Sequence, residues 1–294
     1  MAIGAIEPTR SPKHHFTVDV EEYFHPSALE PWIDPSEWDD LPRRSPELID
    51  RLLGILSARG ITGTFFIVGW LAERERVMVR RIADAGHEIG SHSWDHKRVT
   101  EQTPDAFRAS VRRSKDFLED LTGESVLGFR APSFSIVPGL EWALEVLLEE
   151  GYVYDSSLFP VTQHPTYGYP DADRFAHWMH LAAGPLAEIP PSTLRVWGSN
   201  LPASGGAYFR LLPYALTRQA FKQADSEGLA GTFYTHPWEF DDWVPEMDMA
   251  AVAKFRTFGG RRGLWRRVER FLGEFSFAPM RDTFAAMQEP GADS

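Results

Sequence analysis

The chain of 294 residues contains no cysteine, which excludes disulfides, cysteine–zinc sites and thiol nucleophiles together. It has no apolar stretch near the roughly 20 residues that span a bilayer, so no transmembrane segment is expected. Basic residues are few, with 30 Lys and Arg against 42 Asp and Glu, and the formal net charge of −12 argues against a nucleic-acid partner. A G-x-S-x-G elbow, a P-loop and a dinucleotide-binding glycine motif are also lacking. Nucleophilic catalysis and nucleotide binding therefore find little support.

The first residues, Met1 to His15, contain no apolar segment of the secretory type, so a cytoplasmic location is expected. The lack of cysteine agrees with a reducing compartment without proving one, and export by an unconventional route stays open. A chain of this length with 43% hydrophobic residues can form one large α/β domain or two small ones. We expect one domain over residues 14–287, an extended or disordered segment at 1–13 and a flexible tail at 288–294. The oligomeric state is left open.

Short apolar runs that are typical of buried strands alternate with amphipathic helical patterns. The predicted strands are Phe16–Val20, Thr64–Val68, His87–Ser91, Val126–Arg130, Tyr152–Tyr154, Leu186–Ile189 and Gly231–Tyr234. Helices are predicted over 46–59, 71–85, 104–121 and 140–150, with Ser45 and Thr103 as N-caps of the first and third. Residues 160–180 are predicted to form a long surface loop. Buried strands joined by helical crossovers indicate an α/β fold with a parallel sheet, open or closed into a barrel.

Polar motifs follow five of the predicted strands. They are Asp19–Glu22, His92–His96, Arg130–Pro132, Asp155–Ser157 and His236–Trp238. In parallel α/β folds, function gathers where the carboxyl ends of the strands meet the loops. Core packing does not explain five polar motifs at one edge of a sheet, so we expect them to form one site.

Two histidines four residues apart, His92 and His96, follow the third predicted strand. Imidazoles at this spacing can converge on one divalent cation if a carboxylate arrives from elsewhere in the chain. Such a carboxylate is available after the first strand, where Glu21 and Glu22 follow Asp19. The spacing alone also fits two loop histidines that share no ligand.

Taken together, the motifs of residues 14–285 resemble those of the polysaccharide deacetylases of the NodB-homology type, carbohydrate esterase family 4. The resembling segments, in the family's order, are Thr17–Glu22, His92–His96, Arg130–Phe134, Asp155–Leu158 and Thr235–Phe240. The chain looks most similar to the branch found beside exopolysaccharide and exosortase gene clusters. The resemblance implies a distorted barrel of about seven β/α units, a divalent metal ion and hydrolysis of N-acetyl groups on amino sugars.

The first motif departs from the common family form, which has two adjacent aspartates, a base followed by a metal ligand. Val20 holds the second position here, so the resemblance implies Glu21 as the ligand beside His92 and His96, and Glu22 is the alternative if the strand bends. Zinc is the expected metal, with cobalt, nickel and manganese as alternatives. The chain is also similar to enzymes that act on cyclic imides and ureides, some of them without metal, so a metal-independent reaction is a further alternative.

The resemblance implies catalytic roles for four side chains. Asp19 is the expected general base, and Arg130 is expected to pair with it, because the guanidinium fork suits a carboxylate. His236 is the expected general acid, since a side chain that titrates near neutrality can hand a proton to an amine. Asp155 is expected to hydrogen-bond His236 and to raise its pKa. Each residue also has a structural alternative. Asp19 could cap a loop, and Arg130 could form a surface salt bridge. His236 could be a buried structural histidine, and Asp155 could belong to a turn.

The same motifs contain candidates for substrate binding. The backbone N–H groups around Ser133 and Phe134 are expected to help hold an oxyanion. Trp94 and Trp238 are the expected aromatic lining of a sugar-binding groove, and Trp197 and Trp243 are further candidates, with core packing as the alternative.

A basic segment and the remaining histidines are harder to interpret. Residues 261–272 carry arginines on a helical pattern, which fits a helix packed on the sheet, or a contact with anionic polysaccharide or a membrane face. His87 is expected to be structural. Loop or surface positions are expected for His14, His15, His164, His177 and His180.

We therefore expect a metal-dependent deacetylase that acts on N-acetylhexosamine units of a polysaccharide or a lipid-linked glycan and releases acetate. One alternative is a C–N hydrolase of a small cyclic imide or ureide. Another is a catalytically inactive glycan-binding module. The glycan, its linkage and the native metal are left open.

Overall fold

The structure is a computed structural model that describes residues 13–162, 164, 167–243 and 245–287. Apart from Lys13, the predicted N-terminal segment and the predicted tail lie outside the described residues. None of the described helices is long and apolar enough to cross a lipid bilayer.

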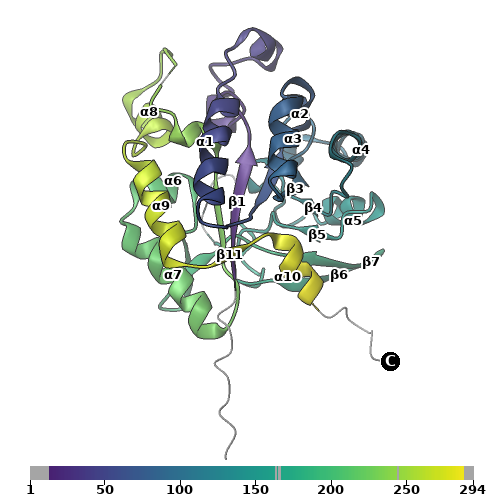
Figure 1. The fold of residues 1–294 in the computed structure, drawn as a ribbon. Coiled ribbons are helices and arrows are strands. Elements are labelled where there is room, and N and C mark those ends of the chain that lie inside the picture. Colours follow the sequence, from purple (N-terminus) through teal and green to yellow (C-terminus); the bar gives the residue numbers. More distant parts are fainter. Residues whose placement is uncertain (1–12, 163, 165–166, 244, 288–294) are drawn as a thin grey trace, which may run out of the picture.

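A mostly parallel sheet forms the centre of the fold (Figure 1). Its hydrogen-bonded strands follow the order β10-β1-β2-β3-β4-β5-β7-β6, β11 pairs with the start of β1, and β6 is antiparallel to β7. The strands of this sheet are β1 His14–Val20, β2 Thr64–Ile67, β3 Glu88–Ser91, β4 Gly128–Phe129, β5 Tyr154–Asp155, β6 His177–Leu181, β7 Gly184–Glu188, β10 Thr232–Thr235 and β11 Phe277–Ala278. A separate antiparallel hairpin consists of β8 Thr193–Val196 and β9 Ser199–Pro202.

The predicted α/β class with a parallel sheet is confirmed. All residues of β1 are buried, as expected of a strand with neighbours on both edges and helices over the sheet. No hydrogen-bonded ladder joins β10 to β6 within the described residues. An isolated parallel bridge between Gly205 and Tyr234 continues the sheet beyond β10. The hydrogen bonds therefore form an open path rather than a closed ring.

Helices connect most of the parallel strands and pack on the sheet. They are α1 Ser45–Ser57, α2 Gly69–Arg74, α3 Arg76–Asp84, α4 Pro104–Thr122, α5 Trp142–Glu149, α6 Gly206–Leu211, α7 Tyr214–Glu227, α8 Ala251–Phe258, α9 Leu264–Glu274 and α10 Met280–Ala286. Short 3-10 turns include η4 Pro132–Phe134 and η5 Pro237–Phe240. The apolar faces of the longer helices join one hydrophobic core with the strands, and this core holds the strand ends in fixed positions.

Two helix starts show how the sequence sets these elements. Thr103 caps α4 as predicted, because its hydroxyl accepts a hydrogen bond from the Ala106 backbone N–H at 3.3 Å. The prediction that Ser45 caps α1 is wrong, since Ser45 lies inside the helix. The buried carboxylate of Glu22 instead accepts hydrogen bonds from the backbone N–H groups of Arg44 and Ser45 and from the Ser45 hydroxyl. Glu22 therefore has a structural role at the start of α1.

Other predictions of local structure need correction. The hairpin β8–β9 and the strands β6 and β11 were not predicted, and the predicted helix over 71–85 is divided at Glu75. Part of the predicted loop over 160–180 forms β6, and residues 163, 165 and 166 lie outside the described residues. His14 and His15 are buried in β1 rather than in a surface loop. His87 is buried, and its Nδ1 accepts a hydrogen bond from the Gly63 N–H, as expected of a structural histidine.

Candidate active site

The carboxyl ends of the parallel strands bring together most of the predicted site residues. Asp19 lies near the end of β1, Glu21 and His236 directly follow β1 and β10, and His92 and His96 lie in the segment that follows β3. The side chains of Asp19, Glu21, His92, His96 and His236 line one cavity of about 640 Å³. The sequence thus placed these five residues correctly at one edge of the sheet.

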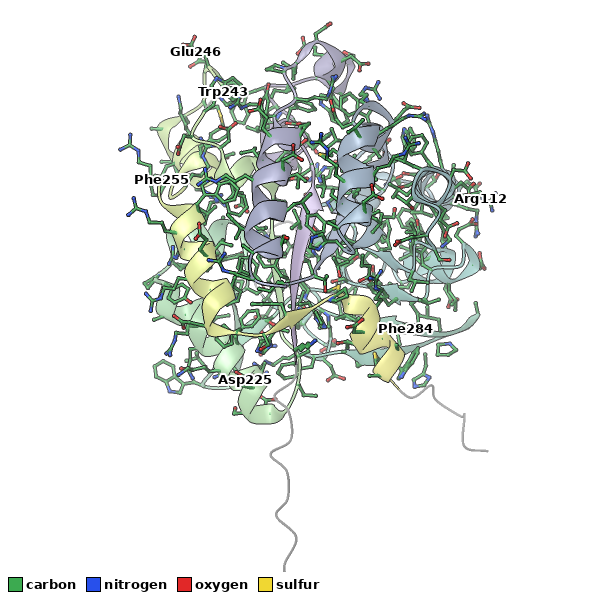
Figure 2. All side chains as sticks on the ribbon, in the orientation of Figure 1. Arg112, Asp225, Trp243, Glu246, Phe255 and Phe284 are labelled. Carbon is green, nitrogen blue, oxygen red and sulfur yellow. The ribbon has the colours of Figure 1, made fainter. Side chains whose placement is uncertain are left out.

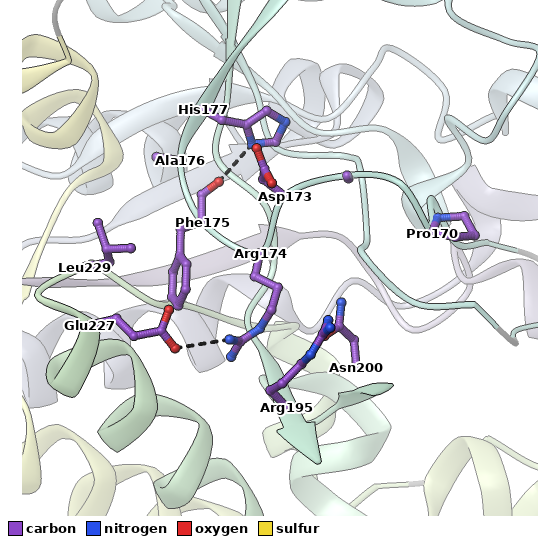
Figure 3. Close-up of a pocket in the computed structure, with 11 residues that line it drawn as sticks. Pro170, Asp173, Arg174, Phe175, Ala176, His177, Arg195, Asn200, Glu227 and Leu229 are labelled. Carbon is purple, nitrogen blue, oxygen red and sulfur yellow. Dashed lines mark hydrogen bonds and ion pairs between the residues drawn. The ribbon is translucent and has the colours of Figure 1, made fainter. Parts of the chain in front are cut away.

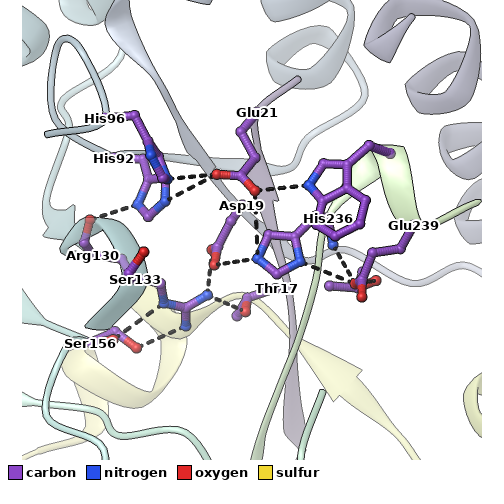
Figure 4. Close-up of polar contacts among 12 residues, drawn as sticks. Thr17, Asp19, Glu21, His92, His96, Arg130, Ser133, Ser156, His236 and Glu239 are labelled. Carbon is purple, nitrogen blue, oxygen red and sulfur yellow. Dashed lines mark hydrogen bonds and ion pairs between the residues drawn. The ribbon is translucent and has the colours of Figure 1, made fainter. Parts of the chain in front are cut away.

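Three of these side chains form a candidate metal centre. Glu21, His92 and His96 each offer a ligand atom, and these atoms lie within 4.8 Å of one another. The Glu21 Oε2 atom lies 2.6 Å from His96 Nε2 and 4.0 Å from His92 Nε2. Figure 4 shows both imidazoles directed at the Glu21 carboxylate. All three side chains are buried, so the surrounding protein restricts their positions.

The donor set fits a divalent ion such as Zn²⁺, which takes imidazole and carboxylate ligands. His92 Nδ1 lies 2.7 Å from the Arg130 carbonyl and donates its proton to it, which leaves the lone pair on Nε2, facing Glu21. Such a hydrogen bond from the opposite ring nitrogen is the usual way in which proteins orient a metal-binding histidine. Burial lowers the pKa of His92 to about 4, so this imidazole is neutral, as a ligand must be.

The electrostatics of Glu21 also suit a ligand. Burial favours the protonated carboxyl, but the nearby imidazoles of His96, His236 and His92 outweigh burial and hold the pKa of Glu21 well below its usual value. The contacts favour Glu21 over Glu22 as a possible ligand, because Glu22 caps α1 while Glu21 faces the two histidines. Trp238 fixes the Glu21 carboxylate further, since its indole Nε1 donates to Glu21 Oε1 at 2.9 Å.

Asp19 is held by the predicted partner. Arg130 is fully buried, and its Nη1 donates to Asp19 Oδ1 at 2.7 Å and to the Thr17 hydroxyl at 2.7 Å. The other guanidinium nitrogens of Arg130 donate to the hydroxyl and the carbonyl of Ser156. The ring of Phe66 supports the guanidinium from 4.2 Å. Arg130 therefore does not line the cavity but fixes one oxygen of Asp19 and leaves the other directed toward His236 (Figure 4).

His236 presents one ring nitrogen to the cavity. Its Nε2 lies 3.7 Å from Asp19 Oδ2 and 3.9 Å from Glu21 Oε1, and its side chain is 18% exposed. Burial lowers the pKa of His236, but the carboxylates of Glu21, Glu239 and Asp19 outweigh burial and raise it to about 9. The imidazolium form is therefore the one that this pocket favours at neutral pH.

The prediction that Asp155 hydrogen-bonds His236 is wrong. His236 Nδ1 pairs with Glu239 Oε2 at 3.1 Å, and Glu239 in turn pairs with the buried guanidinium of Arg210. Burial would raise the pKa of Glu239, but Arg210 and His236 lower it to about 2. Glu239 thus supplies the fixed negative charge that the sequence analysis assigned to Asp155.

Asp155 has a different set of contacts. It shares a hydrogen bond with Glu188, its cross-strand neighbour, and burial raises the pKa of both carboxyl groups, so a proton is retained between them. Asp155 Oδ1 accepts from the Ser157 hydroxyl at 2.6 Å, and the Ser157 oxygen accepts from the Ala131 N–H at 2.8 Å. Asp155 therefore anchors the segment that leads into η4, on the cavity wall.

The predicted substrate-binding residues divide into two groups. Ser133, Phe134 and Trp238 line the cavity. Trp94 does not, because its ring lies across the backbone of Gly69 and beneath the guanidinium of Arg113, so its assignment to substrate binding is wrong.

The other two tryptophan candidates also lie outside this cavity. Trp197 is fully exposed in the turn between β8 and β9, and Trp243 packs against Tyr23 with 38% of its surface exposed.

The two backbone N–H groups at η4 that were predicted to hold an oxyanion are not equally available. The Phe134 N–H donates to the Ala131 carbonyl at 3.0 Å, so it is not available to a ligand. Within the described residues the Ser133 N–H has no acceptor, and the Ser133 hydroxyl bonds to that of Ser27 at 2.7 Å. Ser133 and Phe134 have positive φ angles of 54° and 51°, which cost about 1–3 kcal/mol each for non-glycine residues. Backbone strain of this kind is common at functional sites.

Four further residues of the cavity were not singled out from the sequence. Glu239 and Arg210 form the buried ion pair next to His236, and Tyr167 and Tyr208, which also line the cavity, join through their hydroxyls at 2.6 Å. A signal for Glu239 was present, since its spacing of three from His236 matches the capping box that starts η5. No local pattern marks Arg210 or the two tyrosines.

A second cavity of about 450 Å³ lies beside the hairpin and contains none of the predicted site residues (Figure 3). Its charged groups are used locally, because Arg174 pairs with Glu227 at 3.2 Å and Arg195 donates to Asn200 at 2.8 Å. The first cavity is therefore the candidate active site.

A buried Glu–His–His cluster beside an Asp–Arg pair, at the carboxyl edge of an α/β sheet, has the groups that a hydrolase could use. Residues 36–145 match the model of the polysaccharide deacetylase family, and residues 156–285 match a domain of unknown function, DUF3473. The family match supports the coarser part of the resemblance, that to polysaccharide deacetylases. The exopolysaccharide and exosortase branch stays a prediction.

Two curated relatives match part of this chain. The chain is 31% identical over 121 residues to a peptidoglycan deacetylase of Helicobacter pylori, and 31% identical over 100 residues to a peptidoglycan-N-acetylglucosamine deacetylase of Bacillus cereus. These alignments cover 40% and 34% of this chain and 40% and 36% of those relatives, so the chain spans well under half of their length.

Two solved structures show the same fold. A Mycobacterium smegmatis protein assigned as a polysaccharide deacetylase has a TM-score of 0.64 at 21% identity, covering 95% of this chain and 91% of its own. The allantoinase PuuE has a TM-score of 0.59 at 18% identity, covering 91% and 87%.

Proposed function

We propose that this protein hydrolyses N-acetyl groups on the amino sugars of a glycan and releases acetate. The observation that carries the proposal is the meeting of three possible metal ligands with Asp19 and His236 in one cavity. The polysaccharide deacetylase match of residues 36–145 supports the same reaction class. An exopolysaccharide or its lipid-linked precursor is the proposed substrate.

Glu21, His92 and His96 would hold the metal ion. A divalent ion in such a site polarises a carbonyl oxygen and makes a water molecule more acidic. Asp19 takes the proton of the attacking water, and Arg130 keeps the free Asp19 oxygen on the cavity side. The Ser133 N–H, which has no acceptor among the described residues, is the proposed backbone donor to the developing oxyanion.

His236 donates a proton to the departing nitrogen. The amine is a poor leaving group without this proton, and the imidazolium form of His236 is favoured by Glu239 on its far side. The products are acetate and a free amino sugar. Asp155 acts only at a distance, through Ser157 and the start of η4.

The direct test is acetate release from N-acetylglucosamine oligomers by the purified protein. We expect release that stops after chelation and returns with Zn²⁺. Asp19→Asn and His236→Ala should each abolish it without loss of the fold, which circular dichroism and thermal unfolding would check. Retained turnover in either variant would contradict the assigned roles.

The same assays separate the two alternatives. Turnover of a cyclic ureide such as allantoin, without turnover of the oligomers and without a metal requirement, would favour the small-molecule hydrolase. Saturable glycan binding with no acetate release at any metal concentration would favour the inactive binding module.

A further inference from the structure

Among the residues that the structure describes, one arginine on the cavity wall has no carboxylate partner. Of the charged side chains that line it, Asp19 pairs with Arg130, Glu21 with His96, and Glu239 with Arg210. Arg98 is held by Glu30 and Glu101. Arg256 of α8 also lines the cavity, and within the described residues it makes no ion pair or hydrogen bond to protein.

This lack of a partner is informative because acidic groups are abundant in the chain. Acidic residues exceed basic ones by 12, and most arginines of the described residues pair with a carboxylate or a carbonyl. An unpaired guanidinium on a cavity wall therefore has its five N–H donors directed at solvent or at a ligand. Guanidinium groups bind carboxylates and phosphates in a two-pronged geometry.

The helix that carries Arg256 turns a mixed face to the cavity. Ala253, Arg256 and Thr257 line the cavity, at the spacing of one helix face. Val252 and Phe255 point away and are 72% and 63% exposed. Figure 2 shows Phe255 projecting outward from this helix. Arg256 is therefore the one charged group that α8 presents to the cavity.

The position of Arg256 relative to the centre follows from its neighbours. Burial is the main cause that lowers the pKa of His164, and the charge of Arg256 lowers it further, while the same charge opposes the raised pKa of Tyr208. His164 stacks on Tyr167 with centroids 3.5 Å apart, and Tyr167 bonds to Tyr208. Arg256 thus lies near the aromatic side chains of the same cavity that the possible metal ligands line.

Resting on the proposed function, we infer that Arg256 selects glycans that carry an acidic group next to the N-acetylated sugar. The negative charge of the protein as a whole repels such substrates, and an unpaired cation on the cavity wall offsets this repulsion locally. The acidic group is a carboxylate on the glycan or the diphosphate of a lipid carrier, because both match the guanidinium in the same way.

Binding and turnover are measured side by side. Three ligands are titrated by calorimetry into the metal-loaded protein: a neutral N-acetylglucosamine tetramer, a tetramer in which N-acetylglucosamine alternates with glucuronate, and N-acetylglucosamine diphosphate on a short, soluble prenyl chain. Acetate release is followed with the same three. The variants are Arg256→Gln and, as the matched control, Lys254→Gln, which removes an exposed cation of α8 that does not line the cavity.

The wild type is expected to bind at least one acidic ligand about tenfold more tightly than the neutral tetramer. Arg256→Gln should remove that preference and leave the neutral tetramer within about twofold, while Lys254→Gln should keep it. About 0.5 M salt should weaken the preference, since an exposed charge pair is screened. The source of the acidic group is identified by the ligand, glucuronate or diphosphate, whose binding weakens in Arg256→Gln.

Other outcomes overturn the inference. These are equal binding of acidic and neutral ligands, no binding of either acidic ligand, an equal loss for all ligands in Arg256→Gln, or the same change in Lys254→Gln. A preference that depends on Arg256 without acetate release would uphold the inference and refute the deacetylase proposal. Acetate release without that preference would do the reverse.

Discussion

The contact between Glu239 and His236 allows us to predict how a substitution of Glu239 changes the pKa of His236. Glu239→Gln removes one of three carboxylates that favour the charged imidazole, and Glu239 is the nearest, at 3.1 Å from Nδ1. An opposite charge at this range shifts a pKa by about one to three units. We therefore expect the His236 pKa, about 9 with Glu239 in place, to fall by about one to two units.

The consequence is large at mildly alkaline pH. A group with a pKa of about 9 is roughly nine-tenths protonated at pH 8, and a fall of about one to two units leaves between one-tenth and one-half. If His236 is the general acid, the alkaline limb of the activity profile should move to lower pH by the same amount. The imidazole signals of His236, followed by NMR in the metal-free protein, give the pKa directly.

Asp155→Asn is the matched control, because Asp155 is an equally buried carboxyl that the sequence had connected with His236. It should leave the His236 titration unchanged. Glu239→Gln also leaves the buried Arg210 charge without its partner, which costs about 3–5 kcal/mol. The double variant Glu239→Gln with Arg210→Gln removes that cost and should show the same fall. An unchanged His236 pKa in a folded Glu239 variant, or a fall in the Asp155 variant, would refute the reasoning.

Three other contacts give testable outcomes. Glu21→Gln should weaken Zn²⁺ binding in calorimetry by at least about 100-fold. Glu22→Ala should preserve Zn²⁺ binding and lower the free energy of unfolding by about 1–2 kcal/mol, because it uncaps α1. The opposite result would make Glu22 the ligand. Burial lowers the pKa of His15 to about 3, so this histidine is neutral in the native state and protonates near pH 6.5 after unfolding. Stability should therefore fall as the pH drops from about 6.5 toward 3, by up to about 1.4 kcal/mol per unit, and urea titrations should show a shallower fall in His15→Gln; equal slopes would count against it. Arg130→Lys keeps the charge but loses the fork that holds Asp19, so kcat should drop about 100-fold with little change in KM; a selective rise in KM would instead indicate a substrate contact.

The fold was predictable where local signals were strong. Phe16–Val20 and Thr64–Val68 are rich in apolar and β-branched residues, and they are found in the neighbouring strands β1 and β2. The hairpin β8–β9 was missed because its strands are short and polar and one of them ends in a proline. The Trp197–Gly198 turn, with both residues at positive φ, is stabilised by the hairpin around it, and tryptophan gives no turn signal of its own.

The candidate site was predictable as far as strand ends determine it. Glu21, His92 and His96 follow strands that lie within one sheet, so their meeting follows from parallel topology. The partner of His236 does not follow from topology alone. Asp155 faces Glu188 because β5 and β7 pair in that register, and register between strands distant in sequence leaves no local trace. Glu239 reaches His236 through the tight turn of η5, which a strand-end argument does not contain.

The order of the strands has a consequence for how the polypeptide matures. The two matched segments, residues 36–145 and 156–285, follow one another in the chain, yet β10 from the second lies against β1, whose other edge is shared by β2 and β11. When a nascent chain has emerged only as far as α5, β10 has not yet been made. The backbone N–H and C=O groups on one edge of β1 then lack the partners that they have in the folded protein. Two split halves, co-expressed in one cell, should consequently fold only as a complementing pair, since neither half can complete the strand pairing of β1 without the other.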